Sequence, residues 1–290
     1  MPFDSPGPRG HAAGILLMLG AVLLFSLNDV LGKWLVACYA VWQVLVLRSL
    51  ASLTVLAPLA WRAMRAPGFR VERPGLQALR VALGSGEVAC FYWVVGHMPL
   101  ADAMTYWMAA PVIVTALGAL LLGERVGARR LLLVLLGFAG VAVALGADLG
   151  GPGLPEFGAI LGAVLYALFL LASRQLRATP DVVLACFQML GGLATGVALL
   201  AAGGWRAPGG LDLGLLLMLG LVATLGHMAV TRALKLAPAS VVVPYQYSFL
   251  AWAALFGWLV WGDVPGPEVV AGAALIVLAG LLLYREQRQG

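Results

Sequence analysis

The segment MPLADAMTYW, residues 98–107, is matched 139 positions later by APASVVVPYQ, residues 237–246. The same displacement brings GALLLGER, residues 118–125, over GWLVWGDV, residues 257–264. The aligned pairs are Pro99 with Pro238, Tyr106 with Tyr245, Gly118 with Gly257, Gly123 with Gly262, and Glu124 with Asp263. In a chain so rich in Leu, Ala and Gly, chance similarity is the alternative. The agreement of Pro, Tyr and an acidic residue at one displacement favours a true internal repeat.

The composition places both copies in a membrane. Of the 290 residues, 62% are hydrophobic and 11% are charged, and the mean hydropathy is +0.97. Soluble domains carry about 25% charged residues, so this chain has too little polar surface to cover itself in water. The net charge of +5 comes from basic residues scattered between apolar runs, which is not the pattern of a nucleic-acid-binding patch. Three cysteines in apolar settings predict no disulfide framework.

Apolar runs long enough to cross a bilayer core, which takes about 20 residues per helix, follow one another along the chain. We expect membrane helices over 12–35, 40–61, 75–96, 99–122, 127–147, 156–174, 179–203, 211–234, 238–262 and 266–284. No segment alternates as a barrel strand would. The first run is longer than the apolar core of a signal peptide, so we expect it to be retained as a helix. The predicted class is an all-α polytopic membrane protein with ten transmembrane helices.

Each copy of the repeat contains five of these helices. We expect the first repeat over residues 12–147 and the second over 148–284, between short tails at 1–11 and 285–290. Because five is an odd number, the second repeat must enter the membrane from the opposite face. Two inverted repeats that hold a substrate near the midplane are the architecture of many secondary transporters.

Basic residues are distributed unevenly between the two ends of the expected helices. The first tail and every second linker hold Arg9; Arg62, Arg65, Arg70 and Arg73; Arg125, Arg129 and Arg130; Arg174 and Arg177; Arg232 and Lys235; and Arg285 and Arg288. The opposite linkers hold only Lys33 and Arg206, together with several acidic residues. The positive-inside rule therefore places both termini in the cytoplasm, for a multi-pass protein of a bacterial-type inner membrane.

Residues 118–143, GALLLGERVGARRLLLVLLGFAGVAV, and residues 257–283, GWLVWGDVPGPEVVAGAALIVLAGLLL, end the two repeats in the same way. This signature resembles the drug/metabolite transporter superfamily, and in particular its EamA-type members, over essentially the whole chain. Within the superfamily the chain looks most like the YddG-type amino acid exporters. Asp263 departs from the Glu that is usual at its position, which leaves the implied fold intact.

The resemblance implies a secondary transporter that exports small metabolites by alternating access around a central cavity. Amino acids, aromatic and other uncharged ones above all, are the substrates that it implies, and the Tyr and Trp content agrees with them. Uptake of a riboflavin-like vitamin or another metabolite is the alternative, because fold and orientation do not set the direction of flux.

Few charged residues fall inside the expected helices, where an ionised side chain costs about 2.5–3.5 kcal/mol even on insertion scales. Asp29, Arg48 and Glu87 each lie about ten positions from the expected outer turn next to their helix, which is about 15 Å along a helix. We therefore expect an intramembrane charge cluster in which Arg48 pairs with Asp29 and Glu87 competes. The cluster is either a structural ion pair or a substrate or proton site facing a watery cavity. Two carboxylates against one arginine keep the second alternative open.

A second group of side chains is expected to line a substrate cavity. Rings that also carry a hydroxyl or an indole N–H suit amphipathic small molecules. The candidates are Asn28, Tyr92, Trp93, Tyr106, Trp107, His227, Tyr245 and Gln246. Aromatic residues also fill helix contacts and interfacial belts, so a structural role is the alternative for each. Pro111 and Pro244 interrupt hydrogen bonding in the fourth helix of each repeat and are expected to bend it.

Other functional classes lack their motifs in this chain. There is no H-E-x-x-H, no G-x-S-x-G and no Cys/His ligand spacing, so we expect no enzyme, no metal site and no cofactor. A channel would favour rings of like groups from symmetric subunits. The expected partners are a small-molecule substrate, the lipid bilayer and, if transport is coupled, protons, with no nucleic acid. We expect the chain to be a monomer or a weak dimer.

Overall fold

The computed structural model describes residues 8–71, 73–110, 112–114, 117, 128–144, 153–176, 178–199, 204–236 and 243–287. The helices are α1 (Pro8–Val36), α2 (Val41–Met64), α3 (Pro74–Val95), α4 (Leu100–Trp107), α6 (Ala128–Ala144), α7 (Leu154–Gln175), α8 (Asp181–Ala198), α9 (Gly210–Leu236), α11 (Ser248–Trp261) and α12 (Pro267–Gln287), with a 3₁₀ helix η2 (Val243–Tyr247) before α11. Each expected span overlaps one of these helices, although α4 ends at Trp107, well inside the expected span 99–122, and the predicted all-α class is confirmed. Pro111, Gly118, Gly123 and Glu124 lie outside the described residues.

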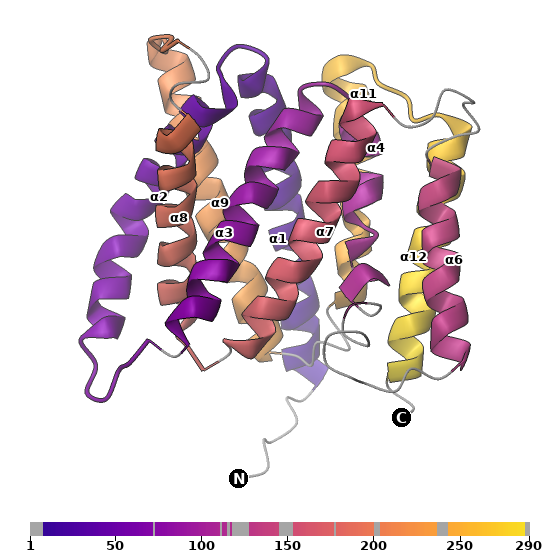
Figure 1. Ribbon diagram of the computed structural model, residues 1–290, viewed down its shortest axis with the longest axis horizontal. Helices are drawn as coiled ribbons and strands as arrows, with labels where there is room; N and C mark the ends of the chain where they lie inside the picture. The colour runs from indigo at the N-terminus through magenta and orange to yellow at the C-terminus, as the bar shows by residue number, and fades with distance from the viewer. Residues whose placement is uncertain are drawn as a thin grey trace.

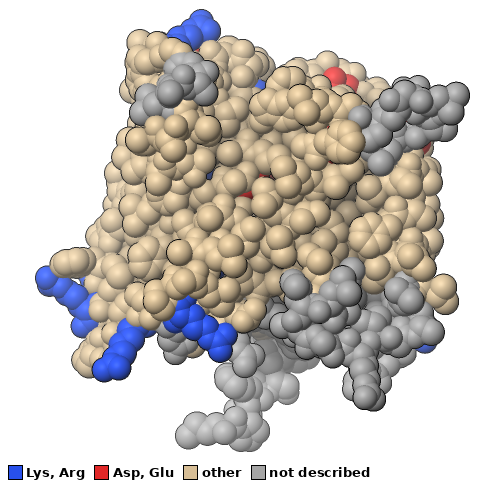
Figure 2. All heavy atoms as spheres, in the orientation of Figure 1, with Lys and Arg blue, Asp and Glu red and all other residues tan. Residues whose placement is uncertain are grey.

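The outer surface of the bundle is apolar, as contact with lipid requires. In the described part of the chain, six helices are long and apolar enough to cross a membrane, namely α1, α2, α3, α7, α8 and α9. Large side chains point outward from them and from α6, for example Leu16, Leu132 and Leu211, which are 69%, 65% and 79% exposed. In Figure 2 a nearly uncharged belt separates the two edges, and most of the visible Lys and Arg side chains gather at the lower edge.

The helices pack in pairs that relate one repeat to the other. α1 packs against α9, and α7, the repeat mate of α1, packs against α3, the mate of α9. In the same way, α1 contacts α11, and their mates α7 and α4 contact each other. Three helices pack directly against their own mates: α2 against α8, α4 against α11, and α6 against α12. Figure 1 shows α2 and α8 at one side of the bundle and α6 and α12 at the other. Exchanging the repeats preserves this pattern, as a pseudo-twofold axis requires.

The two repeats run in opposite directions. Lys33, in the last turn of α1, donates a hydrogen bond to the carbonyl of Met98, which follows α3. Arg73, at the start of α3, donates to Gln175 at the end of α7, so α3 and α7 are antiparallel. α7 therefore begins at the end of the bundle where its mate α1 finishes, and the repeats are inverted. We name the two ends of the bundle the Lys33 end and the Arg73 end.

The chain enters and leaves the bundle at the same end. Asp263, which precedes α12, lies at the Lys33 end because it is bonded to Lys33. α12 runs from there toward the Arg73 end, where α1 begins (Figure 1). The assignment of this end to the cytoplasm remains a prediction from the basic residues.

The fourth helix of each repeat is interrupted at an equivalent place. α4 stops at Trp107, where the N–H of Ala109 bonds the carbonyl of Tyr106, three residues back. In the second repeat the 3₁₀ helix η2 ends at Tyr247, where α11 begins. A displacement of 139 residues aligns Trp107 with Gln246, next to that junction. The expected bend at Pro244 therefore takes the form of a 3₁₀ segment, and the two repeats place their breaks together.

Candidate functional site

Arg48 and Tyr92 form the buried centre of the candidate site. Arg48 Nη1 donates a 2.6 Å hydrogen bond to the Tyr92 hydroxyl, and the guanidinium carbon lies 5.3 Å from the centre of the Tyr92 ring. Both side chains are buried, at 6% and 1% exposure. The ring fits against α1 because residue 32 is Gly, where a Cβ would overlap the Tyr92 ring. The contact joins α2 to α3 beside α1.

Glu87, which is half-buried, and Trp107, which is buried, form a second polar pair on the adjoining helices. Trp107 Nε1 donates a 2.7 Å hydrogen bond to Glu87 Oε1, which joins α4 to α3. The Trp107 ring meets Phe91 edge to face, with 5.2 Å between ring centroids. A Cβ at Gly162 of α7 would overlap the Trp107 indole, so this glycine provides the space that the ring occupies. Glu87 thus lies beside an aromatic wall.

Asp29 and Arg48 do not form the ion pair that the sequence analysis expected. Arg48 has electrostatic interactions with both Asp29 and Glu87. However, no N–O distance of 4 Å or less joins Arg48 to either carboxylate, and among the described residues the ion pair at that distance is Lys33–Asp263. The expectation of a direct pair is therefore wrong. Arg48 instead donates to the phenol of Tyr92, which rises from the face of α3 that packs on Gly32.

The three charged residues lie at similar depths, closer to the helix ends than the sequence suggested. Asp29 is seven positions before the end of α1 at Val36, and Arg48 is seven positions after the start of α2 at Val41. Glu87 is eight positions before Val95, the end of α3. These separations correspond to about 10–12 Å rather than 15 Å. The difference arises because the α1–α2 turn takes residues 37–40 out of the helices.

Arg80 and His227 extend the polar interior toward the Arg73 end. Arg80 is buried and donates to Ser173 Oγ and to the carbonyl of Leu184, with its guanidinium carbon 4.6 Å from the Phe169 ring centre. His227 is exposed and meets Phe25 edge to face, yet it interacts electrostatically with both Arg48 and Arg80. Because those arginines are buried, we infer that the His227 ring faces the interior space rather than lipid.

Sequence reasoning did not find Arg80. Its position inside the expected helix 75–96 was a usable signal, since basic residues in a membrane span are rare. With Arg80 included, the buried arginines Arg48 and Arg80 match the carboxylates Asp29 and Glu87 in number. The negative excess expected from two carboxylates and one arginine is thus absent.

The remaining sequence candidates are not all brought together. Asn28 donates a 2.7 Å hydrogen bond to the carbonyl of Leu219, so it joins α1 to α9. Trp93 packs on His97, with 4.5 Å between ring centroids, near the Lys33 end. Tyr106 is buried in the same cluster as Tyr92 and Trp107. Tyr245, which is 38% exposed, and Gln246 lie on η2, which contacts α1.

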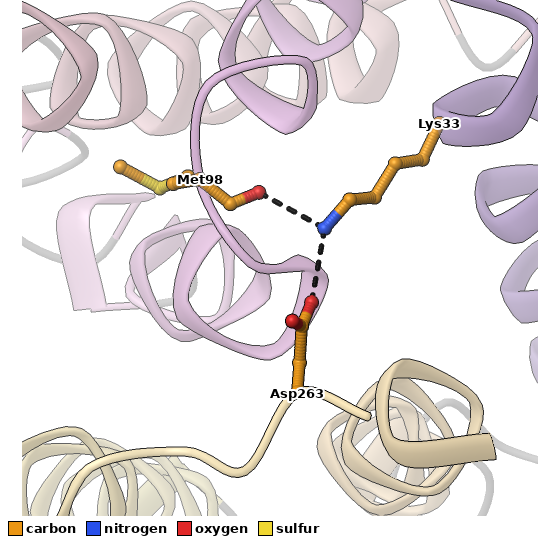
Figure 3. A network of polar contacts seen from close by, with 3 residues as sticks. All are labelled: Lys33, Met98 and Asp263. Atoms are coloured by element: carbon orange, nitrogen blue, oxygen red, sulfur yellow. Dashed lines mark hydrogen bonds and ion pairs between the residues drawn. The ribbon is translucent and has the colours of Figure 1, made fainter. Parts of the chain in front are cut away.

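A polar network closes the Lys33 end across the two repeats (Figure 3). Lys33 Nζ lies 3.2 Å from Asp263 Oδ2 and 3.2 Å from the Met98 carbonyl oxygen. The ammonium group also lies 4.7 Å from the centre of the Trp261 ring. The Lys33 and Asp263 side chains are only 13% and 28% exposed. This arrangement ties α1 to the turns before α4 and α12.

A second set of bonds at the Lys33 end joins the α1–α2 turn and the start of α2 to the first turn of α9 and the segment before it. The Tyr39 hydroxyl donates to Asp212 at 2.5 Å, and this hydrogen bond raises the pKa of Tyr39. The Gln43 amide exchanges two hydrogen bonds with the backbone of Arg206, whose guanidinium donates to the Cys38 carbonyl. These bonds also cross between the repeats.

The site offers binding chemistry rather than metal ligation. In the described part of the chain, no three His, Cys, Asp or Glu side chains come together as ligands for a metal ion. The interior instead combines guanidinium donors, carboxylate acceptors and aromatic faces within one buried region. Such a set can hold a small polar molecule that also carries an apolar group.

Comparison with known proteins gives a consistent assignment. The EamA-like transporter family matches residues 12–146 and 154–285. The pseudopaline exporter CntI of Pseudomonas aeruginosa is 31% identical, covering 95% of this chain and 97% of its own. A riboflavin transporter of Rhizobium johnstonii is also 31% identical, over 97% of this chain and 93% of its own. An S-adenosylmethionine uptake transporter of Rickettsia felis is 23% identical, over 97% of this chain and 95% of its own. A crystal structure 20% identical to this chain shares the fold, with a TM-score of 0.62 over 95% of this chain and 99% of that one.

Proposed function

This chain belongs to the EamA-like transporter family, and from that premise we propose that it exports small amino-acid-like metabolites by alternating access. The observation that carries the proposal is the pair of interrupted fourth helices, α4 and η2–α11, at equivalent places in inverted repeats. Interrupted helices in corresponding positions of two halves form the substrate sites of many secondary transporters. The charged and aromatic groups of the candidate site lie beside the break in α4.

The character of the interior supports an amphipathic substrate. Glu87 and Arg48 supply charges of both signs, which suits a molecule with an amine and an acid. Phe91, Tyr92 and Trp107 supply ring faces against which an apolar side chain can pack. Aromatic and other uncharged amino acids have this combination of groups.

The polar network at the Lys33 end supports alternating access. It joins the two repeats on one side of the site, so the structure corresponds to a conformation closed at that end. We place that end outside the cell, because most basic residues of the linkers and tails are expected at the opposite end. Substrate would then enter from the cytoplasm, as export requires.

Reconstitution of the purified chain into liposomes tests the proposed function. Labelled phenylalanine, tyrosine, leucine, a nucleoside and riboflavin are compared for counterflow, with and without an uncoupler. We expect counterflow of the aromatic amino acids, and competition among them. If none of these amino acids moves or competes while another solute moves, the proposed substrate is wrong and the carrier assignment stands.

Uptake of a vitamin is the second candidate function. It is favoured by the riboflavin transporters among the relatives, which match this chain over almost its full length. The same liposome panel separates the two candidates, because riboflavin counterflow without amino acid counterflow supports the vitamin.

A further inference from the structure

We propose that Tyr92 is a positioning residue, which holds the Arg48 guanidinium so that the interior carboxylates of α1 and α3 stay available to the ammonium group of a substrate. These carboxylates belong to Asp29 and Glu87. The inference rests on the proposed function and makes it more specific, because it assigns the substrate amine to the carboxylates. It also gives a physical reason for the absence of the ion pair that the sequence analysis expected.

A neutral acceptor engages the Arg48 guanidinium. Arg48 Nη1 donates to the Tyr92 hydroxyl at 2.6 Å, and the guanidinium carbon lies 5.3 Å from the centre of the ring. In the described residues, no carboxylate oxygen lies within 4 Å of an Arg48 nitrogen. A phenol, whose ordinary pKa is about 10, accepts a hydrogen bond from a guanidinium without cancelling its charge. Arg48 therefore has a partner but no direct counter-ion.

The Tyr92 hydroxyl competes with the two carboxylates for Arg48. Tyr92 interacts electrostatically with Arg48 and with both Asp29 and Glu87, so the four groups are neighbours. Buried charges of opposite sign ordinarily pair, because an unpaired charge is costly in a medium of low dielectric constant. Here the guanidinium is bound to the phenol instead. Without the hydroxyl, Arg48 would lose this acceptor and a carboxylate would be the favourable replacement.

Helix packing fixes the position of the Tyr92 ring. A Cβ at Gly32 of α1 would overlap the ring, which shows how closely the ring lies against that helix. The side chain is 1% exposed, and its ring centroid lies 5.8 Å from that of Phe91. The ring therefore cannot move aside without repacking α1 against α3. The hydroxyl is a fixed point to which Arg48 is bound.

The two carboxylates keep acceptor oxygens that Arg48 does not occupy. Asp29 is half-buried, and in the described part of the chain it has neither a hydrogen bond nor an ion pair within 4 Å. Glu87 accepts one hydrogen bond, from the uncharged indole of Trp107. Charge-assisted hydrogen bonds to carboxylates are among the strong ones, so an ammonium group suits these free oxygens.

Other titratable groups also face this region. Cys90 on α3 and Tyr166 on α7 interact electrostatically with Glu87, and His227 on α9 interacts with Arg48. Among the described residues, Arg48 is the cation that interacts with both carboxylates. The placement of this one guanidinium therefore decides whether the carboxylates are neutralised by the protein or are left for a ligand.

Ligand-induced stabilisation of the full chain in detergent tests the role of Tyr92. The probes are 2-phenylethylamine, a cation at neutral pH, and its neutral isostere 2-phenylethanol, compared by thermal unfolding. We expect a saturable rise in Tm with the amine and an apparent affinity at least tenfold weaker for the alcohol. Tyr92→Phe keeps the ring and removes the acceptor, so the preference for the amine should fall below threefold. Tyr166→Phe removes another phenol near Glu87 and should preserve it.

A second substitution separates positioning from packing. Tyr92→Phe combined with Arg48→Gln removes the guanidinium that would occupy a carboxylate, so the preference for the amine should return. Damage to packing at Tyr92 would not be repaired in this way. An amine preference that survives Tyr92→Phe, or one that is absent from the folded double variant, would overturn the positioning role.

The alcohol decides the case in which the double variant does not fold. Loss of positioning in Tyr92→Phe should weaken binding of the amine and leave the affinity for the alcohol unchanged, because the aromatic surfaces are intact. Weakening of both probes by the same factor would overturn the inference.

Transport separates this inference from the proposed function. In liposomes, we expect L-phenylalanine counterflow by Tyr92→Phe to show a KM at least tenfold higher than in the unmodified chain. Counterflow with an unchanged KM would overturn the positioning role and leave the carrier standing. An amine preference that depends on Tyr92, without any amino acid counterflow, would overturn the proposed substrate and leave the positioning role standing.

Discussion

Glu87 is the acidic side chain whose surroundings are best defined in the interior. Its Oε1 accepts from Trp107, and it interacts electrostatically with Arg48. A carboxylate that lies among buried aromatic rings can bind a proton or a substrate amine in turn. This exchange would couple the movement of protons across the membrane to the movement of substrate. Because the amide of Gln can accept the same hydrogen bond from Trp107, a Glu87→Gln variant isolates the charge from the packing.

We expect Glu87→Gln to lose the acceleration of substrate exchange by an imposed pH gradient, and to exchange substrate more weakly because the charge that faces the substrate amine is gone. The reason is that the variant binds Trp107 but cannot take up a proton. The measurement is counterflow and gradient-driven flux in liposomes, with Glu268→Gln, at the start of α12, as the matched control. Gradient-driven flux that is unchanged in Glu87→Gln would exclude this residue as the proton carrier.

Close approach between helices depends on small residues at particular turns. Gly162 on α7 faces the Trp107 indole of α4, and Gly32 on α1 faces the Tyr92 ring of α3. In both places a glycine of one helix accommodates an aromatic ring that belongs to the candidate site. Spacings such as Gly158-x-x-x-Gly162 are common in a chain with 37 glycines. Only the contacts of each glycine distinguish those that position a ring.

We expect Gly162→Ala to lower the free energy of unfolding by about 1–3 kcal/mol, because the added methyl group overpacks the Trp107 contact. Thermal unfolding in detergent measures the change. Gly20→Ala on α1 is the matched control, since its Cβ would meet nothing within 4 Å, and it should be neutral or slightly stabilising. A Gly162→Ala variant as stable as Gly20→Ala would contradict the packing described here.

The two ends of the molecule differ in the hydrogen bonds and ion pairs that join the first repeat to the second. Lys33–Asp263, Tyr39–Asp212 and Arg206 to the Cys38 carbonyl all join the repeats at the Lys33 end. At the Arg73 end, Arg73 donates to Gln175 at an exposed position, and farther inside Arg80 donates to Ser173 and to the Leu184 carbonyl. A carrier that opens alternately must break such contacts at each end in turn. The Lys33–Asp263 pair is therefore a candidate latch.

We expect Lys33→Ala or Asp263→Asn to favour the conformation open at the Lys33 end. A partly exposed ion pair contributes up to about 1 kcal/mol, so the population should change by a factor of up to about five. The measurement is the labelling rate of Cys90 by an impermeant maleimide in a background without Cys38 and Cys186. The exchanged variant Lys33→Asp with Asp263→Lys should restore slow labelling, and failure of both single variants to raise the rate would exclude a latch.

We expect the Lys33 end to face the outside of the cell, since the tails and the arginine-rich linkers are expected at the opposite end. Native Cys38 is exposed in the α1–α2 turn and should react with an impermeant maleimide added to intact cells. A cysteine introduced by Ala66→Cys, in the loop after α2, should react only in lysed cells. The reverse pattern of labelling would invert the predicted topology.

The amino-acid sequence by itself determined the membrane class, the span positions and the inverted repeat. These depend on apolar run length, on composition and on one alignment of the chain with itself, all of which can be read locally. The candidates for the interior were also found from single polar or aromatic residues within apolar runs. This approach found Arg48, Glu87 and Trp107 but passed over Arg80, which stands near the start of its span.

The tertiary structure alone decided which of these groups meet. Asp29 and Arg48 lie at one depth, which suits them to pair, yet Arg48 bonds Tyr92, and Lys33 bonds Asp263, which is 230 residues away. The bond between Arg48 and Tyr92 likewise depends on α3 lying against Gly32 of α1. Depth follows from counting residues along a helix, whereas partners depend on how each helix is rotated about its axis. That rotation is set by contacts such as Gly162 with Trp107, which no local pattern encodes.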